Sequence, residues 1–400
     1  MATDERSALL TEDEREAVWR PIEEALTLPN RAFTCEAWFA VEAEKIYRQS
    51  WVAYCFEHEL PHEGDVMPRD IIDFPLMAVR GTDGKVRVFH NVCPYDSCPV
   101  VLEQQHRREF LRVPYHGWLY DLNGRLVGIP YWDGTPEGSL ASLGERRADL
   151  LPVACETFMG IVFVSLAEQS EPFASYIAPL AEILEPWDLA SASPGRMSMG
   201  EGETTFSYEV AANWKTYYEN TCINVLHEAF AHTLYADSPE VPRVHDGVKT
   251  YWDHVDRNFL ALSYKAEDFA NTYPFLDIPH LGREEEPVNA YYGALFPNLH
   301  IGIAPDSIVA VLAFPERPDH TTLYESYYFR RDAATDPTLR TSREVLYHLW
   351  RMAHLEDQRV IEGVQRARHS PAVNQMFYAP FWDVMHHAFS QMVLEALGEK

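Results

Sequence analysis

The chain has 400 residues, 46% of them hydrophobic and 13% aromatic, and a formal net charge of −28 at pH 7. This length and composition predict a folded globular protein with two packed domains rather than a disordered chain. The charge excludes a nucleic-acid partner, because a phosphate backbone is bound by clustered Lys and Arg. It indicates a solvated acidic surface, or alternatively cationic substrates or partners.

The N-terminal segment and the cysteines predict a cytoplasmic protein. Residues 1–16 are polar and acidic, which is not typical of a signal peptide. No stretch reaches the roughly 18 consecutive apolar residues that a membrane span needs. The 6 cysteines are scattered through an aromatic-rich sequence, and this pattern fits reduced thiols better than a disulfide framework.

The pattern of apolar residues changes from helical spacing to short alternating runs near residue 51. Residues 11–50 carry helical spacing of apolar side chains, with a second helix expected over 40–47. Short alternating runs follow, and two pairs of them flank a turn dipeptide: 77–80 and 86–89 around Asp83-Gly84, and 119–121 and 125–127 around Asn123-Gly124. Both dipeptides tolerate the positive φ angles of a type I′ turn, so both predict hairpins. Residues 51–165 are therefore expected to form a small all-β domain.

Residues 166–400 mix both kinds of pattern. Helices are expected near 173–186 and over 207–235, 341–366 and 380–398, and strands over 259–264, 300–303, 308–314 and 322–329. The sum is an α+β fold. It consists of a helix-flanked antiparallel sheet, with residues 1–50 as its N-terminal helical part. The β domain is inserted near the start of this fold.

A candidate iron site lies within residues 213–232, where Asn213-Trp214-Lys215, Glu219-Asn220, His227 and His232 follow one another. Two histidines and one carboxylate form a facial triad that holds ferrous iron and leaves positions open for oxygen and substrate. On a straight helix, side chains five residues apart point about 140° away from each other. We therefore expect the helix to bend or loosen between His227 and His232.

Further motifs extend this pattern along the chain, at 42–51, 64–80, 88–93, 114–121, 296–298, and Glu356-Asp357 with Gln365. Together with the 213–232 segment, they resemble the α (oxygenase) subunits of Rieske non-haem iron oxygenases. The resemblance implies a non-haem iron oxidoreductase, either a monooxygenase or a dioxygenase. It also implies a Rieske-like β domain inserted near the N-terminus of a helix-grip (START-like) catalytic domain that occupies 166–400.

The resemblance also suggests the remaining residues around the iron. It implies that the third ligand is a carboxylate in a late helix, here Asp357, with Glu356 beside it as a rival and His354 one turn earlier. In many family members a carboxylate three residues before the first histidine links a neighbouring subunit's cluster to the iron. Here that position is Asn224, which can hydrogen-bond a histidine but carries no charge. Asn220 and Asn224 are the candidate catalytic residues.

The loop pair that binds the cluster in this family reads Cys-x-His-x15–17-Cys-x-x-His, with two cysteines on one iron and two histidines on the other. The corresponding positions here are Cys93, Tyr95, Val113 and His116, and Asp96-Ser97 replaces the usual Arg-Gly. Valine cannot bind a metal, and a phenol is a poor ligand for this cluster. Each iron would keep a single protein ligand, so a [2Fe–2S] cluster is not expected.

Three states of this loop pair stay open. The first is a metal-free β domain with buried thiols. The second is a tetrahedral zinc site built from Cys93, Cys98 and His116, with His90 or His106 as the fourth ligand. The third is a disulfide between Cys93 and Cys98.

Three functions remain compatible with these motifs. The first is an Fe²⁺ oxygenase that takes electrons from its substrate, a co-substrate or a small reductant. The second is an α-like subunit that exchanges electrons with a cluster-bearing homologue in a mixed trimer. The third is a non-catalytic subunit. The family's trimer also makes a homotrimer possible, and the partners expected in addition are O₂ and a small-molecule substrate.

The substrate is expected to be a small amine or betaine, or a single-ring aromatic compound. Candidate pocket residues are aromatic side chains near the iron motifs: Tyr217, Tyr291, Phe296 and Phe377. Such rings can stack on an aromatic substrate or surround a quaternary ammonium group by cation–π attraction. Asp383, His386 and His387 form a polar cluster near the C-terminus. They are expected either to belong to a solvent-facing helix or to support a site or interface.

Overall fold

The structure is a computed structural model, and it describes residues 9–195, 204–222, 225–236, 238, 241–265, 277–281 and 289–399. The chain divides into two compact units. The catalytic unit comprises Met1–Tyr47 and Glu171–Lys400, and the β unit comprises Arg48–Ser170. Within the described residues, no helix is both long enough and apolar enough to cross a membrane.

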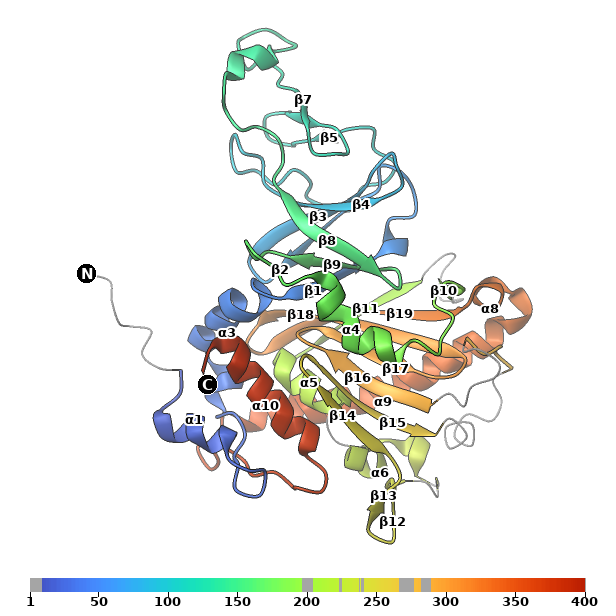
Figure 1. Ribbon diagram of the computed structural model, residues 1–400. Helices are drawn as coiled ribbons and strands as arrows, with labels where there is room; N and C mark the ends of the chain where they lie inside the picture. The colour runs from blue at the N-terminus through green and yellow to red at the C-terminus, as the bar shows by residue number, and fades with distance from the viewer. Residues whose placement is uncertain are drawn as a thin grey trace. The chain divides into compact units, whose positions relative to one another are not determined.

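The β unit is built from antiparallel strands, as the alternating pattern predicts. One sheet has the order β1-β9-β8-β4-β3-β2, with β1 (Trp51–Phe56), β9 (Ile161–Ser165), β8 (Pro152–Phe158), β4 (Val86–His90), β3 (Phe74–Arg80) and β2 (Val66–Ile71). A smaller sheet contains β5 (Leu111–Arg112), β6 (Leu119–Tyr120) and β7 (Leu126–Gly128). Short helical turns lie at Glu57–Glu59 and Leu140–Leu143. The strands are labelled in Figure 1.

Both predicted hairpins are present, but their turns differ from the expected type. β3 pairs with β4 around Gly84, and β6 pairs with β7 around Gly124. Only the glycine of each dipeptide has a positive φ, +76° and +79°, so the type I′ prediction was wrong. A type I′ turn requires positive φ at both central residues. Asp246-Gly247 meets this condition in an unpredicted hairpin of β12 (Val244–His245) and β13 (Val248–Lys249).

The catalytic unit contains one antiparallel sheet in the order β10-β19-β18-β17-β16-β15-β14, with β11 also paired to β19. The strands are β10 (Ala192–Pro194), β11 (Thr205–Val210), β14 (Trp252–Asp256), β15 (Phe259–Lys265), β16 (Asn289–Leu295), β17 (Leu299–Ile303), β18 (Ser307–Arg317) and β19 (His320–Arg330). This arrangement, with helices packed on the sheet, confirms the predicted helix-flanked antiparallel fold. Its core includes residues of β11, β18, β19 and α9.

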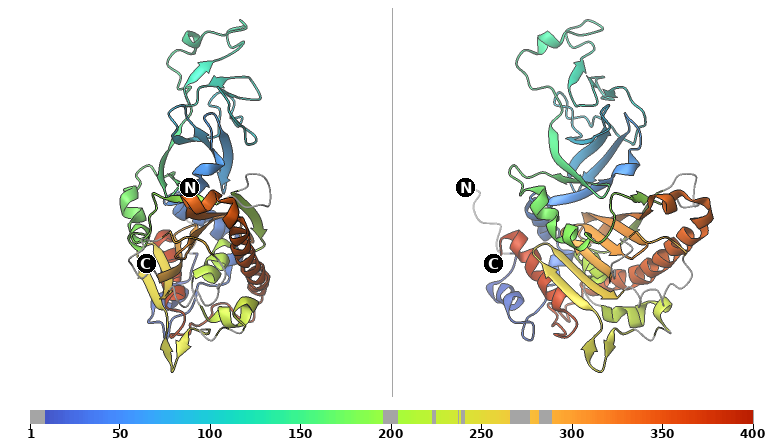
Figure 2. Two further views of the ribbon diagram at one scale, coloured as in Figure 1. Left: turned by 90° about the vertical axis from the view of Figure 1, so that its right-hand side faces the viewer. Right: turned by 45° about the vertical axis from the view of Figure 1, so that its right-hand side comes forward.

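The helices of this unit come from both ends of the chain. They are α1 (Glu12–Trp19), α2 (Arg31–Thr34), α3 (Glu36–Glu42), the π-helix Ala43–Tyr47, α4 (Phe173–Ile183), α5 (Trp214–Cys222), α6 (Glu228–Ala231), α8 (Arg331–Thr335), α9 (Arg340–Ala367) and α10 (Val384–Leu397). Short turns lie at Val225–His227, Thr233–Tyr235 and Pro337–Leu339. The long helix α9 runs along the sheet (Figure 2), and α5 contacts both the sheet and α9.

The predicted helix over 207–235 was wrong. Thr205–Val210 is strand β11, which pairs with β19 in the register Tyr208↔Leu323. Its alternating Thr, Phe, Tyr and Val side chains suit a half-buried strand better than a helix. Helical structure begins only at Trp214 and is divided into α5, the turn Val225–His227 and α6.

Buried charges anchor α5 in the catalytic unit. The Glu42 carboxylate of α3 accepts hydrogen bonds from Trp38 Nε1 (3.0 Å), Trp214 Nε1 (2.9 Å) and Lys215 Nζ (2.5 Å). The side chains of Glu42 and Lys215 are fully buried. Breaking one partner of such a pair typically costs about 3–5 kcal/mol, because the other charge stays buried without compensation. The Trp214-Lys215 part of the sequence motif therefore fixes the helix and does not contact the metal candidates.

Candidate metal centre

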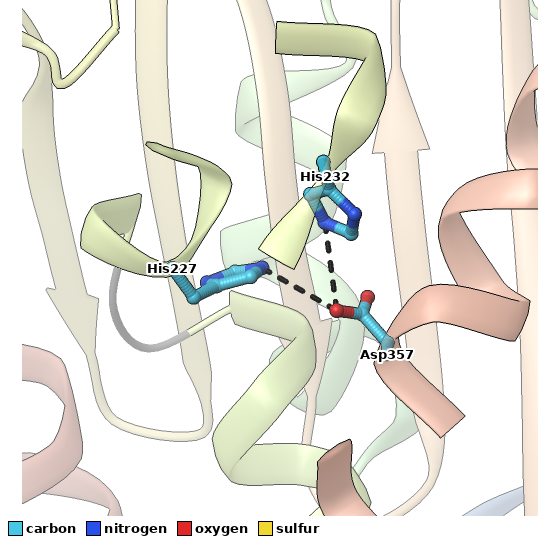
Figure 3. A group of neighbouring side chains, drawn as sticks. All are labelled: His227, His232 and Asp357. Atoms are coloured by element: carbon cyan, nitrogen blue, oxygen red, sulfur yellow. Dashed lines mark ion pairs between the residues drawn. The ribbon is translucent and has the colours of Figure 1, made fainter. Parts of the chain in front are cut away.

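The predicted histidines lie on either side of a four-residue helix, and the helical conformation ends at the second of them. His227 ends the turn Val225–His227, the four-residue helix α6 follows, and His232 ends α6 in an extended conformation (φ −97°, ψ 115°). The two imidazole rings are 5.2 Å apart and nearly perpendicular. The expected loosening between the two histidines is therefore present. It lets two side chains that a straight helix would separate face the same point (Figure 3).

Asp357 of α9 completes the group. Its Oδ1 atom lies 3.8 Å from His227 Nε2 and 3.5 Å from His232 Nε2 (Figure 3). One ligand atom from each of the three residues lies within 4.8 Å of the others. Among the described residues, no other group of three His, Cys, Asp or Glu side chains meets this condition.

The chemistry of these atoms fits a metal ion. Asp357 Oδ1 is buried and accepts no hydrogen bond, although an unpaired buried carboxylate oxygen is costly. A cation between the three residues would remove that cost. Two imidazole nitrogens and one carboxylate are the donor set of non-haem ferrous sites. The residues present therefore fit Fe²⁺.

The rival carboxylate Glu356 makes different contacts. Its Oε2 atom lies 3.2 Å from His232 Nδ1, and Thr233 donates to its carboxylate through both the backbone N–H and Oγ1. A second buried pair holds the other end of α6. Arg243 Nε donates to Glu228 Oε2 at 2.9 Å, and the Arg243 guanidinium stacks over Tyr264. Both ends of the segment between the histidines are thus fixed by carboxylates.

A cavity of about 90 Å³ opens beside the three ligands, between the sheet and the helices α5 and α9. It is lined by Tyr208, Val210, Tyr217, Asn220, Thr221, Val225, His227, Glu228, His232, Tyr235, Leu262, Tyr292, His300, Ile301, Gly302, Val309, Val311, Trp350, Ala353, His354, Asp357, Gln358 and Ile361. The volume is several times the ~10–15 Å³ that a single water needs. Its wall combines aromatic and aliphatic side chains with a few polar groups, as is usual for small-molecule sites.

Two polar groups on the cavity wall, Tyr208 and His354, and their neighbour Glu325 were not predicted as a set. Tyr208 donates to Glu325 Oε2 at 2.9 Å, and its hydroxyl lies 2.8 Å from His354 Nδ1. The sequence could only suggest His354, one helical turn before Asp357, as a supporting residue. Glu325 is 1% exposed in strand β19, close to Tyr324, Tyr327 and Phe329 in the sequence, and a carboxylate among these aromatic residues was the available signal.

His300 also lines the cavity and was missed. It is 1% exposed, and its Nδ1 has no hydrogen-bond partner. Burial, with a smaller contribution from His354, lowers the pKa of His300 to about 3, so its ring is neutral at physiological pH.

The predicted pocket residues divide into two groups. Tyr217 and the catalytic candidate Asn220 line the cavity, whereas Tyr291, Phe296 and Phe377 do not. Tyr291 alternates with Tyr292 on β16 and faces the opposite side of the sheet, where its ring lies 6.0 Å from Trp187. Phe296 packs against Trp214 and Tyr218. Phe377 is 85% exposed.

The other predicted residues are placed as follows. Asn224 lies outside the described residues. His386 Nε2 lies 3.0 Å from Glu219 Oε1, so it belongs to the charged group that anchors α5. His387 contacts the Val18 carbonyl, and Asp383 accepts from the Ala379 N–H just before α10.

The loop pair of the β unit has no comparable ligand group. Val113 is fully buried in the apolar core, and the Tyr95 ring stacks on Trp118 at 5.1 Å. Cys93 Sγ lies 3.7 Å from Tyr120 Oη. The His116 ring is paired with the Asp96 carboxylate through Nδ1. The four positions therefore hold two possible ligands, and each of those contacts a neighbouring protein group.

The zinc and disulfide alternatives for this loop pair gain no support. Cys93, Cys98 and His116 are all described, and they do not form a group with ligand atoms close enough for a metal ion. Cys93 and Cys98 are free thiols, so the disulfide alternative was wrong. Burial raises the pKa of the Cys93 thiol, which therefore stays protonated.

Comparison with known families now adds to this geometry. Residues 199–399, half of the chain, match the model of the ring hydroxylating alpha subunit (catalytic domain). The chain belongs to this family. Residues 50–141 match the model of the Rieske [2Fe-2S] domain. These matches confirm the predicted family and the two-part architecture, and they identify the chain as an oxidoreductase of the Rieske oxygenase type.

Two curated relatives cover most of the chain. The carnitine monooxygenase oxygenase subunit of Escherichia coli is 26% identical and covers 86% of this chain and 84% of that protein. The glycine betaine monooxygenase oxygenase subunit of Pseudomonas aeruginosa is 24% identical and covers 95% of this chain and 92% of that protein.

Solved structures share the fold. A quaternary ammonium Rieske monooxygenase in complex with L-carnitine has a TM-score of 0.73 at 19% identity, and covers 96% of this chain and 98% of that chain. Naphthalene 1,2-dioxygenase from Rhodococcus sp. has a TM-score of 0.69 at 18% identity, and covers 96% of this chain and 99% of that chain.

Proposed function

We propose that the chain is a mononuclear non-haem iron oxygenase that acts with O₂ on a small organic substrate without a Rieske cluster of its own. The observation that carries this proposal is a contrast within one chain. His227, His232 and Asp357 form a complete ligand group, and the buried Oδ1 of Asp357 accepts no hydrogen bond from the described residues. Tyr95 and Val113, in contrast, occupy two of the four cluster-ligand positions.

The residues around the cavity have distinct tasks in this proposal. His227, His232 and Asp357 hold Fe²⁺, which when bound supplies the redox chemistry with O₂. The aromatic wall of Tyr208, Tyr292 and Trp350 orients the substrate, and the aliphatic lining keeps bulk water away from its reacting carbon. The loop pair of the β unit does not fit a [2Fe–2S] cluster, so no electron is routed through it. Electrons come from the substrate, a co-substrate or a small reductant.

The substrate class proposed is a small amine or betaine, or a single-ring aromatic compound. The aromatic side chains Tyr208, Tyr292 and Trp350 can attract a quaternary ammonium group through their ring faces. The named relatives act on carnitine and glycine betaine, which supports the betaine branch of the proposal. The cavity of about 90 Å³ supports a small reacting end rather than a fused ring system.

A second candidate is an α-like subunit in a mixed trimer, in which a cluster-bearing homologue supplies the electrons. Its support is that the relatives are themselves named as oxygenase subunits of larger enzymes. A homotrimer is the corresponding assembly for the first candidate.

Metal and sulfide analysis of the anaerobically purified, iron-loaded protein tests the proposal. We expect about one iron and no acid-labile sulfide per subunit, whereas a complete Rieske centre would add two irons and two sulfides. Oxygen uptake with glycine betaine, L-carnitine or N,N-dimethylphenylurea is then measured with ascorbate as the only reductant. Uptake that begins only after a cluster-bearing homologue is added would support the mixed trimer. Sulfide in the wild-type protein would overturn the loss of the cluster.

A further inference from the structure

His232 is contacted on both ring nitrogens by two successive residues of α9. Its Nε2 atom faces Asp357 Oδ1 at 3.5 Å, and its Nδ1 atom faces Glu356 Oε2 at 3.2 Å. The imidazole is 6% exposed, so the ring is largely shielded from solvent where it meets these two carboxylates. A single helical segment therefore supplies both a neighbouring ligand and a group that acts on the opposite side of the same ring.

The contact with Nδ1 determines which nitrogen carries the proton. An ionised carboxylate can only accept hydrogen bonds, so Nδ1 of His232 must donate to Glu356. In a neutral imidazole the other nitrogen, Nε2, then has the free lone pair. That nitrogen is the one directed at Asp357 Oδ1 (Figure 3).

Glu356 also fixes the backbone directly after His232. The Thr233 N–H lies 3.3 Å from both carboxylate oxygens, and Thr233 Oγ1 donates to Glu356 Oε1 at 2.6 Å. At this point α6 ends, and the chain turns into Thr233–Tyr235 through the extended conformation of His232. The helix therefore orients the ring and also secures the turn that carries it.

We propose that Glu356 is a positioning residue that sets the tautomer and orientation of His232 for metal binding, and is not a metal ligand itself. This inference depends on the proposed function in one respect, which is that the bound ion is Fe²⁺. Both oxygens of Glu356 already accept hydrogen bonds from His232 and Thr233, whereas Asp357 Oδ1 accepts none. A partner of this kind makes a metal-bound imidazole a better donor.

The test compares Fe²⁺ and Co²⁺ affinities of the full-length protein by anaerobic competition with a chromophoric chelator. Loss of such a partner typically weakens metal binding about 10–100-fold. We expect Glu356→Ala to raise Kd by that factor and to shift the visible spectrum of bound Co²⁺. We expect Glu356→Gln to recover most of the affinity, because its amide oxygen still accepts the Nδ1–H. Thr233→Val, which removes only the hydroxyl contact, should change Kd by less than about threefold.

The outcomes separate this inference from the proposed function. If the wild-type protein binds neither ion, the iron site itself is wrong. If the wild type binds but Glu356→Ala matches it in affinity and spectrum, only the positioning role is wrong. The role is also overturned if Glu356→Ala abolishes binding as completely as Asp357→Ala, since Glu356 would then be a ligand. If Thr233→Val and Glu356→Ala lost equal metal affinity, Glu356 would act only by holding the turn after His232 and not by setting the tautomer of the ring. Far-ultraviolet circular dichroism and thermal unfolding confirm that each variant is folded.

Discussion

Two regions of this chain are related to the two metal sites of one family. One region has kept the metal ligands, and the other has kept the loop spacing but only two of the four ligands. In the catalytic unit, His227, His232 and Asp357 come from two separate segments and place three ligand atoms within 4.8 Å. In the β unit, the loop pair keeps the family's spacing and its Pro-Tyr-His-Gly-Trp segment, but Tyr95 and Val113 stand at two ligand positions. One region has the ligands in place, and the other has the loop shape without them.

The contacts within each region explain how both can persist. Asp357 Oδ1 is buried and accepts no hydrogen bond from the described residues, which is unfavourable unless a cation lies beside it. In the loop pair, protein contacts replace the links that a cluster would provide. Tyr95 stacks on Trp118, and His116 pairs with Asp96. A loop that is held by packing keeps its backbone when its ligands change, so a match to a domain family does not by itself establish the cofactor.

Removal of Asp357 should have the largest effect on this comparison. We expect Asp357→Ala to lower bound iron from about one per subunit to near zero, because two imidazoles alone do not complete the facial triad. Oxygen uptake should be lost with the iron. Inductively coupled plasma analysis of the anaerobically loaded protein measures the first effect directly.

The matched control is Glu344→Ala on the same helix. Glu344 pairs with Arg340 one turn away, a surface pair worth about 0.5 kcal/mol or less. It should leave iron content unchanged. If Asp357→Ala retains iron, the catalytic unit does not hold its metal as the geometry indicates, and the contrast between the two regions disappears.

Restoring the missing ligands should have the next largest effect. The variant Tyr95→His/Asp96→Arg/Ser97→Gly/Val113→Cys returns four ligands to the loop pair and removes the carboxylate that pairs with His116. After anaerobic reconstitution with iron and sulfide we expect two additional irons and two sulfides per subunit, with the absorbance of a Rieske centre. Tyr95→His alone, with three ligands, should gain no sulfide. Sulfide uptake by the wild-type protein would show that the present residues already suffice.

The third prediction concerns how the stability that Glu219 of α5 contributes to the catalytic unit depends on pH. Burial alone would raise the pKa of Glu219, but Arg368 and His386 outweigh it and lower the pKa from 4.5 to about 2. A folded-state pKa below the unfolded value contributes stability that is complete above about pH 4.5 and is lost as the pH falls towards 2. The shift corresponds to about 3 kcal/mol.

Urea unfolding of the wild type and Glu219→Gln measures this contribution across that pH range. The amide resembles a protonated carboxyl group, so the difference in unfolding free energy should be largest near pH 6 and small near pH 2.5. A difference that does not depend on pH would mean that the ion pairs with Arg368 and His386 do not stabilise α5. In that case the ion pairs of Glu219 would not help to position α5, the helix that precedes His227 and His232 in the chain.

The architecture and the ligand group could be predicted from the sequence for physical reasons. The turn dipeptides and alternating runs of the β unit depend on local backbone preference, which a short segment expresses by itself. The long helix α9 (Arg340–Ala367) was predicted over 341–366 because its apolar spacing persists over many turns. The two histidines and Asp357 were predicted as a group, and the structure brings them together.

What could not be predicted depended on contacts between distant segments. Thr205–Val210 was assigned to a helix, because an alternation over six residues is a short signal and the pairing with β19 that stabilises the strand is not visible in the sequence. Tyr291 was chosen instead of Tyr292, since one residue of register decides which face of β16 meets the cavity. Glu325 and His300 were missed because a single sequence does not show that His300 lies on a cavity wall or that Glu325 accepts from a wall residue, Tyr208.

The smallest predicted effect concerns the backbone of the loop that carries Tyr95 and Ser97. Ser97 has a φ of +59°, a left-handed conformation that costs a non-glycine residue roughly 1 kcal/mol. The family resemblance places a glycine at this position. Ser97 is exposed, so Ser97→Gly should raise the unfolding free energy of the protein by about 0.5–1 kcal/mol, and Ser97→Ala should give no gain. Chemical denaturation of the three proteins measures the difference. If Ser97→Gly gave no gain over Ser97→Ala, the loop would have left the glycine-type conformation. The loop pair would then not have kept the family's backbone conformation, and the comparison of the two regions would fail.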